Sequence, residues 1–265
     1  TYYIVYKSVG KGGVDNGTRV DRPCFSLDIE PGVVYHFKVT ACNSGGESFP
    51  SEVIAAVRKP NASKTVLVVN GFHRLSSPAL LNDGRQGFDL DADLGVTEGL
   101  TAGWNGRFIA GNDFNYASEH VAAIASAHKY NVVSCSSHAI ETGIVDVNDY
   151  DAVARVLGLE KYAANLTRYY KTFAPVMKNT LTRYLANGGK LLVSGAFVGS
   201  DNAETGDTGR EWLARTLHVS WDGAAKTGSL NGISGLGVNG IGIYDTPNAD
   251  HYCVQSADKL SPAPG

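Results

Sequence analysis

The sequence predicts two parts, an all-β segment followed by a three-layer α/β domain with a mainly parallel sheet. Residues 1–58 are rich in β-branched and aromatic residues separated by turn residues, which is typical of short antiparallel strands. From residue 64 onward, apolar runs alternate with segments of helical spacing, which predicts βαβ units. We therefore predict one domain over 1–58, a linker over 59–63 (KPNAS) and a second domain over 64–265.

Composition excludes several classes of protein. Charged residues make up 18% of the 265 residues, against about 25% in a typical domain. The net charge is −3, so a basic nucleic-acid-binding surface is not expected. No apolar run approaches the ~20 residues of a membrane-spanning helix. The 31 glycines predict many tight turns.

The first segment contains four expected strands and a turn-rich hairpin. The turn GKGGVDNG occupies residues 10–17, and we expect strands over residues 1–9, 24–29, 33–42 and 51–57. Alternation places Tyr35, Phe37 and Val39 on the core side of the third strand, so Cys42 should face outward. Cys24 should face outward from another strand, which argues against a disulfide between these two cysteines.

One phrase in this segment carries a family resemblance. Ile29–Tyr35 reads IEPGVVY and leads into FKVTACNSGGES, which resembles the second half of a fibronectin type III module. The resemblance implies a β-sandwich of which only part is present. Its first two strands would lie ahead of Thr1, and the chain would be a fragment of a longer protein.

The second domain alternates strands and helices. We expect strands over residues 64–70, 131–135, 151–158 and 190–196, and helices over residues 117–130, 175–189 and 209–217. Pro175 suits the first turn of its helix, and Gly188 suits its end. The connection over residues 71–116 lacks periodicity, and residues 222–248 are rich in Gly and Asn, with at most one or two short strands expected.

The carboxyl ends of these strands hold the candidate site residues, since ligands of open parallel sheets bind there. The alternative is that these polar residues cap helices and satisfy turns, as Ser, Asn and Asp often do. As binding residues the sequence suggests Asn70, His73, Ser136, Ser137, Phe197 and Ser200. As catalytic candidates it suggests Ser194, His138, Glu160 and Asp201.

A second resemblance covers the last predicted strand. GGKLLVSGAFVGSD, residues 188–201, resembles the nucleophile elbow of class I glutamine-amidotransferase-like domains, whose fold is flavodoxin-like. Gly195 and Gly199 match the two glycines of that elbow, and Phe197 stands at the cysteine position. The resemblance implies the architecture without the thiolate that covalent acyl transfer needs.

A third resemblance spans residues 1 to about 260. KTVLVVNGFHRLSSP, VVSCSSHAIETG and the 188–201 segment resemble large secreted bacterial envelope proteins in which a fibronectin type III module precedes an α/β domain. Relatives carry names such as xanthan lyase or N-acetylmuramoyl-L-alanine amidase. The amidase zinc ligands have no counterpart here, and the family continues past Gly265, so the α/β domain is expected to be truncated.

Together these observations favour an accessory region of a larger glycan- or cell-wall-active protein, without enzymatic activity in this segment. The alternative is a polysaccharide hydrolase or lyase that uses the Ser194, His138, Glu160 and Asp201 groups, with His as acid or base. A spacer without a ligand is a third possibility. We expect a secreted, periplasmic or cell-surface location. Expected partners are polysaccharide or peptidoglycan and other modules of the same chain, with no cofactor and no metal.

Overall fold

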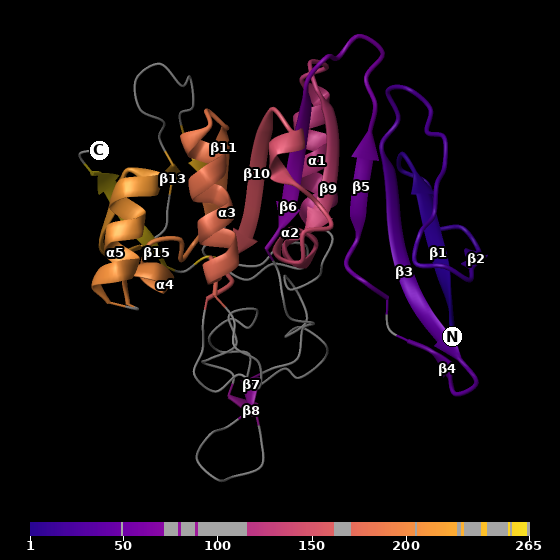
Figure 1. Ribbon diagram of the computed structural model, residues 1–265, viewed down its shortest axis with the longest axis horizontal. Coiled ribbons are helices and arrows are strands. Elements are labelled where there is room, and N and C mark those ends of the chain that lie inside the picture. Colours follow the sequence, from indigo (N-terminus) through magenta and orange to yellow (C-terminus); the bar gives the residue numbers. More distant parts are fainter. Residues whose placement is uncertain are drawn as a thin grey trace. The chain divides into compact units, whose positions relative to one another are not determined.

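The structure is a computed structural model that describes residues 1–48, 50–71, 79–80, 88–89, 116–161, 171–204, 206–226, 229–230, 240–242, 254 and 256–263. Figure 1 shows its elements coloured along the sequence. The strands are β1 Tyr2–Val9, β2 Thr18–Val20, β3 Tyr35–Asn43, β4 Gly46–Glu47, β5 Ile54–Val57, β6 Thr65–Asn70, β7 Ala79–Leu80, β8 Phe88–Asp89, β9 Asn131–Ser136, β10 Ala152–Gly158, β11 Leu191–Gly195, β12 Val219–Lys226, β13 Ser229–Leu230, β14 Ile241–Gly242 and β15 Ser256–Pro262. The helices are α1 Tyr116–Ser126, α2 Ser137–Glu141, the 3₁₀ helix η3 Val147–Asp149, α3 Pro175–Ala186, α4 Ser200–Ala203, α5 Asp207–Trp212 and the π-helix η4 Leu213–Leu217.

The chain divides into two compact units that interleave along the sequence. The first unit comprises Thr1–Asn70, Phe114–Val156 and Asn179–Leu192. The second comprises Gly71–Asp113, Leu157–Lys178 and Val193–Gly265. The predicted domain boundary at residues 59–63 does not coincide with a boundary between these units, and the predicted division stays a prediction.

Nine strands of the described chain form one large mixed sheet, which is compatible with the predicted α/β class. The strand order is β11-β10-β6-β9-β5-β3-β1-β2, and β4 pairs with β3. β6 is central to the parallel part, since it pairs in parallel with both β9 and β10. Residues 66–70 of β6 are all buried, as its uninterrupted apolar run predicts.

The N-terminal strands are antiparallel and continue the same sheet. β3 pairs with β1, β4 and β5, and β1 also pairs with β2. β5 pairs antiparallel with β9, through Ala56 opposite Val133 and Val57 opposite Val132. The segment 59–63 therefore joins two strands, β5 and β6, that lie on either side of β9 in one sheet.

Two expectations for the N-terminal segment are wrong. Residues 24–29 form no strand, and Phe25 and Leu27 there are 40% and 42% exposed. Pro23 and Pro31 bracket this stretch, and neither can donate a ladder hydrogen bond.

Cys42 was expected to face outward, yet it is only 4% exposed. Its face of the sheet is covered by a polar network, because the hydroxyls of Tyr6 and Thr40 both donate to Glu47, each at 2.6 Å. Cys24 and Cys42 are both free cysteines, although the two premises of the parity argument, a strand over residues 24–29 and an outward-facing Cys42, are wrong.

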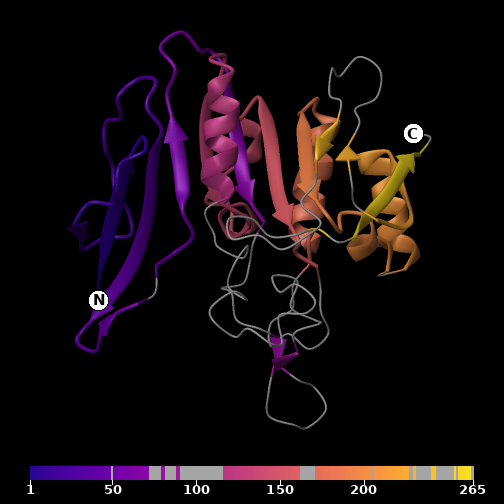
Figure 2. The ribbon, with the colours of Figure 1, turned by 180° about the vertical axis from the view of Figure 1, so that it is seen from behind.

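Helix α1 covers one face of the sheet. It packs on β5, β6 and β9, and Figure 2 shows it on the face turned toward the viewer. Val121, Ala117 and Ala125 are 0%, 1% and 2% exposed, which matches the helical spacing predicted for 117–130, although the helix ends earlier, at Ser126.

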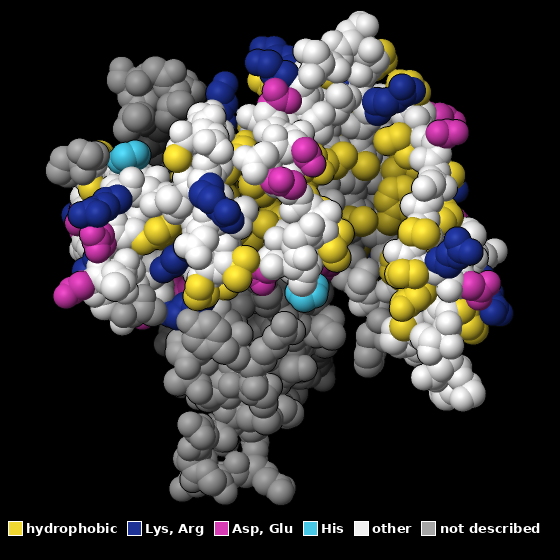
Figure 3. Space-filling view, viewed as in Figure 1, with side chains coloured by type: hydrophobic (Ala, Val, Ile, Leu, Met, Phe, Trp, Pro, Cys, Tyr) yellow, Lys and Arg dark blue, Asp and Glu magenta, His cyan; other side chains and the backbone are white. Residues whose placement is uncertain are grey.

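The opposite face of β1, β3 and β5 carries exposed apolar side chains. Figure 3 shows hydrophobic side chains gathered over these strands. Val9 and Ile54 are 39% and 38% exposed, and the register places both on the same face as Phe37. This face of the three strands is therefore an exposed apolar surface.

The second unit holds a two-stranded sheet and short helices. β12 and β15 pair antiparallel, with an irregularity between Trp221 and Ala224. The predicted helix over residues 209–217 is present as α5 and the π-helix η4. Among the described helices, none is both long enough and apolar enough to span a membrane.

Candidate functional site

The predicted site residues are divided between the two units. Asn70, Ser136, Ser137 and His138 belong to the first unit, and Glu160, Ser194, Phe197, Ser200 and Asp201 belong to the second. His73 lies outside the described residues. Each unit builds its own polar cluster.

A buried polar cluster stands where β6 and β9 end. Ser137 is 2% exposed, and its hydroxyl donates to the main-chain oxygen of Asn70 at 2.8 Å. Arg155, 1% exposed on β10, donates from its guanidinium to the same hydroxyl at 2.8 Å. The Asn70 amide donates to the Glu52 carboxylate, which comes from the segment ahead of β5. We call Glu52, Asn70, Cys135, Ser137 and Arg155 the strand-end cluster.

Burial dominates the protonation of this cluster. It raises the pKa of the Glu52 carboxyl, and the hydrogen bond from Asn70 opposes that effect. Burial likewise raises the pKa of the Cys135 thiol to about 12; the negative charge of Glu52 adds to this, and Arg155 opposes it. Cys135 is therefore a neutral thiol near pH 7 and does not meet the thiolate requirement of nucleophilic catalysis.

This state of Cys135 predicts slow modification and a pH effect on stability. In native protein, a thiol reagent should label the exposed Cys24 and spare Cys135 until the chain unfolds, as measured by peptide mass spectrometry.

The folded-state pKa of Cys135 lies above the unfolded value of 9.0, so the folded protein retains a proton that the unfolded chain releases. Its stabilising contribution is full below about pH 9 and is lost as the pH rises toward 12. In a Cys135→Ala variant, the free energy of unfolding should lack this part of its dependence on pH. Labelling of native Cys135 as fast as Cys24 would contradict the assignment.

Ser136 and His138 lie at the start of α2, on either side of Ser137 in the sequence. Ser136 is the N-cap of α2, and its hydroxyl accepts a hydrogen bond from the Ala139 N–H at 3.1 Å. His138 lies in α2 with an exposed side chain, and its main-chain oxygen accepts from the Thr142 N–H at 2.9 Å. For Ser136, the capping alternative raised from the sequence accounts for the observed contact.

The second unit places Asp201 at the centre of a buried network. Asp201 is 0% exposed, and one of its carboxylate oxygens accepts from both the N–H and the hydroxyl of Thr172 at 2.8 Å. The ammonium of Lys171 lies 3.2 Å from the other oxygen and donates to the Asp201 main-chain oxygen at 2.8 Å. The side-chain amide of Asn202 donates to the Thr172 hydroxyl and to the Val198 oxygen. The Asp201 carboxylate therefore connects Lys171 and Thr172 to α4 through these hydrogen bonds.

Ser194 and Glu160 make no described hydrogen bond to Asp201. Ser194 lies half-buried in β11, and no hydrogen bond links it to Glu160 or Asp201 in the described part of the chain. Glu160 is 4% exposed, and its N–H donates to the Leu157 oxygen at 2.9 Å. The four groups suggested for catalysis are thus not joined by any hydrogen bond that the structure describes.

The two glycines of the predicted elbow are explained by close packing. A Cβ on Gly195 would lie 2.7 Å from the Cβ of Leu157. A Cβ on Gly199 would lie 2.7 Å from Leu260 and 3.0 Å from Trp221. Larger residues would push β11 from its neighbours or β12 and β15 from α4.

The backbone amides that follow this elbow are already bound. The Asp258 carboxylate of β15 accepts from the N–H groups of Gly199 and Ser200, each at 2.7 Å. Such paired amides form an anion-binding arrangement, here filled by a side chain of the same unit. Among the described residues the buried Ser200 hydroxyl has no hydrogen-bond partner. Phe197 is half-buried, and the Lys161 ammonium lies 5.4 Å from its ring centre.

Several contributing residues were missed from the sequence. Arg155 had a signal, since it is the charged residue within the otherwise apolar run AVARVLG of a predicted buried strand. Glu52, Thr172 and Asp258 had none, because their partners lie far away in the chain. Across the described residues no group of three or more His, Cys, Asp or Glu side chains is placed to hold a metal ion.

Comparison with known proteins adds no relative. No protein-family model matches the chain, and neither the curated proteins nor the solved structures contain a match. The resemblances drawn from the sequence therefore stay predictions.

Proposed function

We propose that this chain is an accessory, glycan-interacting region of a larger secreted or periplasmic protein, and that it has no catalytic activity of its own. The observation that carries the proposal is that buried polar side chains at the carboxyl ends of the strands are engaged in hydrogen bonds within the protein. Ser137 and Asp201 are buried and hydrogen-bonded within their own units.

The elbow region supports the same proposal. Phe197 stands at the position where an amidotransferase-like nucleophile belongs, and a phenyl ring cannot form an acyl intermediate. The amides of Gly199 and Ser200 resemble an oxyanion hole, yet the Asp258 carboxylate occupies them. A substrate oxyanion would have to displace a charged group that already has good geometry.

We also propose the finer architecture that the sequence suggested, a partial fibronectin type III-like module next to a flavodoxin-like α/β domain. The exposed apolar face of β1, β3 and β5 supports a sandwich half. The order β9-β6-β10-β11 supports the α/β type, since it corresponds to the 2-1-3-4 order of flavodoxin-like sheets. The secreted setting and the cell-wall or polysaccharide partner rest on the family resemblance.

A binding survey tests the function. The purified 265-residue chain is titrated by calorimetry with soluble peptidoglycan fragments and with neutral and acidic polysaccharides. We expect saturable binding to at least one glycan class. The proposal is rejected if no glycan gives a heat of binding and the chain is not retained on insoluble peptidoglycan.

A further inference from the structure

A cleft opens at the other end of the parallel strands, where β6, β10 and β11 begin. Its volume is about 720 Å³, and all of its lining residues belong to the first unit. Val66, Ala152 and Ala154 from the strands line it together with Ile124 of α1 and Leu192 of β11. Leu192 is 63% exposed, so apolar surface of the cleft is open to solvent.

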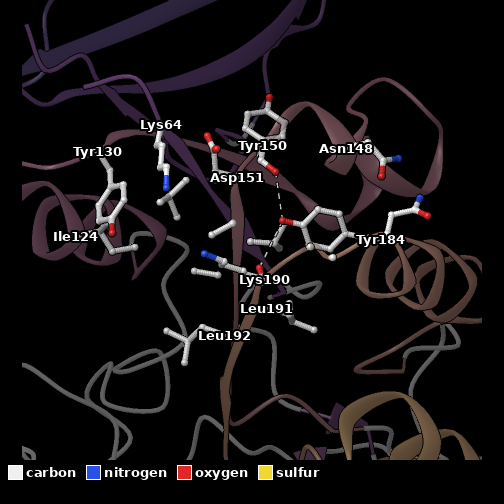
Figure 4. Close-up of a pocket in the computed structure, with 17 residues that line it drawn as sticks. Lys64, Ile124, Tyr130, Asn148, Tyr150, Asp151, Tyr184, Lys190, Leu191 and Leu192 are labelled. Carbon is white, nitrogen blue, oxygen red and sulfur yellow. Dashed lines mark hydrogen bonds between the residues drawn. The ribbon is translucent and has the colours of Figure 1, made fainter. Parts of the chain in front are cut away.

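Three tyrosines from different segments line this cleft. Tyr184 of α3 is 3% exposed, and its hydroxyl lies 3.2 Å from the Tyr150 oxygen and 3.5 Å from the Lys190 oxygen (Figure 4). A Cβ on Gly189 would lie 2.5 Å from the Tyr184 ring, so the Gly189 backbone packs directly against this ring. The rings of Tyr130 and Tyr150 are half-buried at the cleft. The wall is therefore aromatic and preformed.

Two lysines bring positive charge to the same space. Lys64 precedes β6 and Lys190 precedes β11, and both ammonium groups point toward the middle of the cleft (Figure 4). Within the described chain neither ammonium makes an ion pair, unlike those of Lys7, Lys161 and Lys171. The carboxylate of Asp151 beside them accepts from the Thr65 N–H at 2.8 Å. The cleft thus combines two cations and one carboxylate, a net positive charge, with ring faces and an apolar floor.

We propose that this cleft binds an acidic saccharide, a sugar chain that carries uronate or similar carboxylate groups. Ring faces of tyrosine suit the C–H faces of pyranose rings, because these side chains present an apolar body and a polar tip. Lys64 and Lys190 pair with the carboxylates, and Asn148 and Asn187 on the cleft wall offer amides to the hydroxyls. The inference rests on the proposed function for its choice of glycans, and it adds both the site and the charge of the ligand.

Calorimetry with defined oligosaccharides tests this site. The probe is a galacturonate hexamer, the neutral comparator is a glucose hexamer of similar length, and polyglutamate controls for charge without sugar. We expect the galacturonate hexamer to bind most tightly and its affinity to fall steeply with salt. Lys64→Ala with Lys190→Ala should weaken binding about tenfold, since each exposed ion pair contributes a few-fold.

Matched variants make the test specific. The double variant Lys11→Ala with Lys259→Ala removes the same charge from exposed lysines outside the cleft and should bind as the parent does. Tyr130→Phe keeps the ring and should retain affinity, whereas Tyr130→Ala should lose about tenfold. Thermal unfolding midpoints equal to that of the parent establish that the lysine variants are folded.

The outcomes separate this inference from the proposed function. Loss of affinity confined to the cleft variants supports the site. Three results would overturn the inference and leave the proposed function standing. The chain could bind neutral glycans but not the galacturonate hexamer, or both double lysine variants could lose the same affinity for the hexamer. The chain could also bind polyglutamate as tightly as the hexamer. Absence of binding to every glycan would overturn both.

Discussion

Asp201→Ala should destabilise the protein by about 3 to 5 kcal/mol, one of the two largest single effects that the structure predicts. The substitution removes a fully buried carboxylate that accepts from Thr172 twice and pairs with Lys171, whose side chain is only 9% exposed. The desolvated ammonium of Lys171 loses its charge partner, and two Thr172 donors lose their acceptor. Chemical denaturation followed by far-UV circular dichroism measures the change.

Two control substitutions sharpen this result. Asp201→Asn keeps one oxygen for Thr172 but no charge, so we expect a smaller loss than for alanine. Asp21 forms an ion pair with Arg19 in which both side chains are mostly exposed, at 71% and 63%. Asp21→Ala should therefore leave the unfolding midpoint unchanged. Equal stability of Asp201→Ala and the parent would show that the buried network does not hold the second unit together.

Arg155→Ala should cost a similar amount, about 3 to 5 kcal/mol, by a different route. Arg155 is among the largest fully buried side chains described, and its removal empties a large volume inside the sheet. The Ser137 hydroxyl also loses a donor at 2.8 Å. The same denaturation experiment measures this effect.

A shape-conserving variant separates packing from charge at this position. Arg155→Met fills most of the volume with an unbranched side chain that adapts to irregular space, but it makes no hydrogen bond to the Ser137 hydroxyl. We expect Arg155→Met to recover most of the stability that Arg155→Ala loses. If Arg155→Met is as unstable as Arg155→Ala, the guanidinium bonds themselves stabilise the strand-end cluster.

The local pattern of the sequence predicted much of the fold. β6 follows from an uninterrupted apolar run, α1 from helical spacing, and α3 from Pro175 at its start and Gly188 past its end. Each of these signals is short-range, since it depends on residues within one element. The strand expected over residues 24–29 is absent, because Pro23 and Pro31 flank the stretch and neither can donate a ladder hydrogen bond.

The candidate site was less predictable, because its contacts are long-range. Ser136 and Ser137 were correctly placed at the end of β9, yet their partners decide what they do. Arg155 comes from β10, which β6 separates from β9, and Asp258 is bonded to Gly199 across 59 positions. The cleft at Lys64 and Lys190 lies where β6, β10 and β11 begin, whereas the rule for open parallel sheets predicts ligands at the carboxyl ends of the strands.

The most direct measurement asks whether a glycan that the chain binds is altered by it. The bound saccharide is incubated with the chain, and its length and unsaturation are then measured by mass spectrometry. We expect the saccharide to be recovered intact, because the strand-end groups are engaged in structural bonds. Cleavage products that appear with the parent chain and disappear with Ser194→Ala or His138→Ala would contradict a purely binding role.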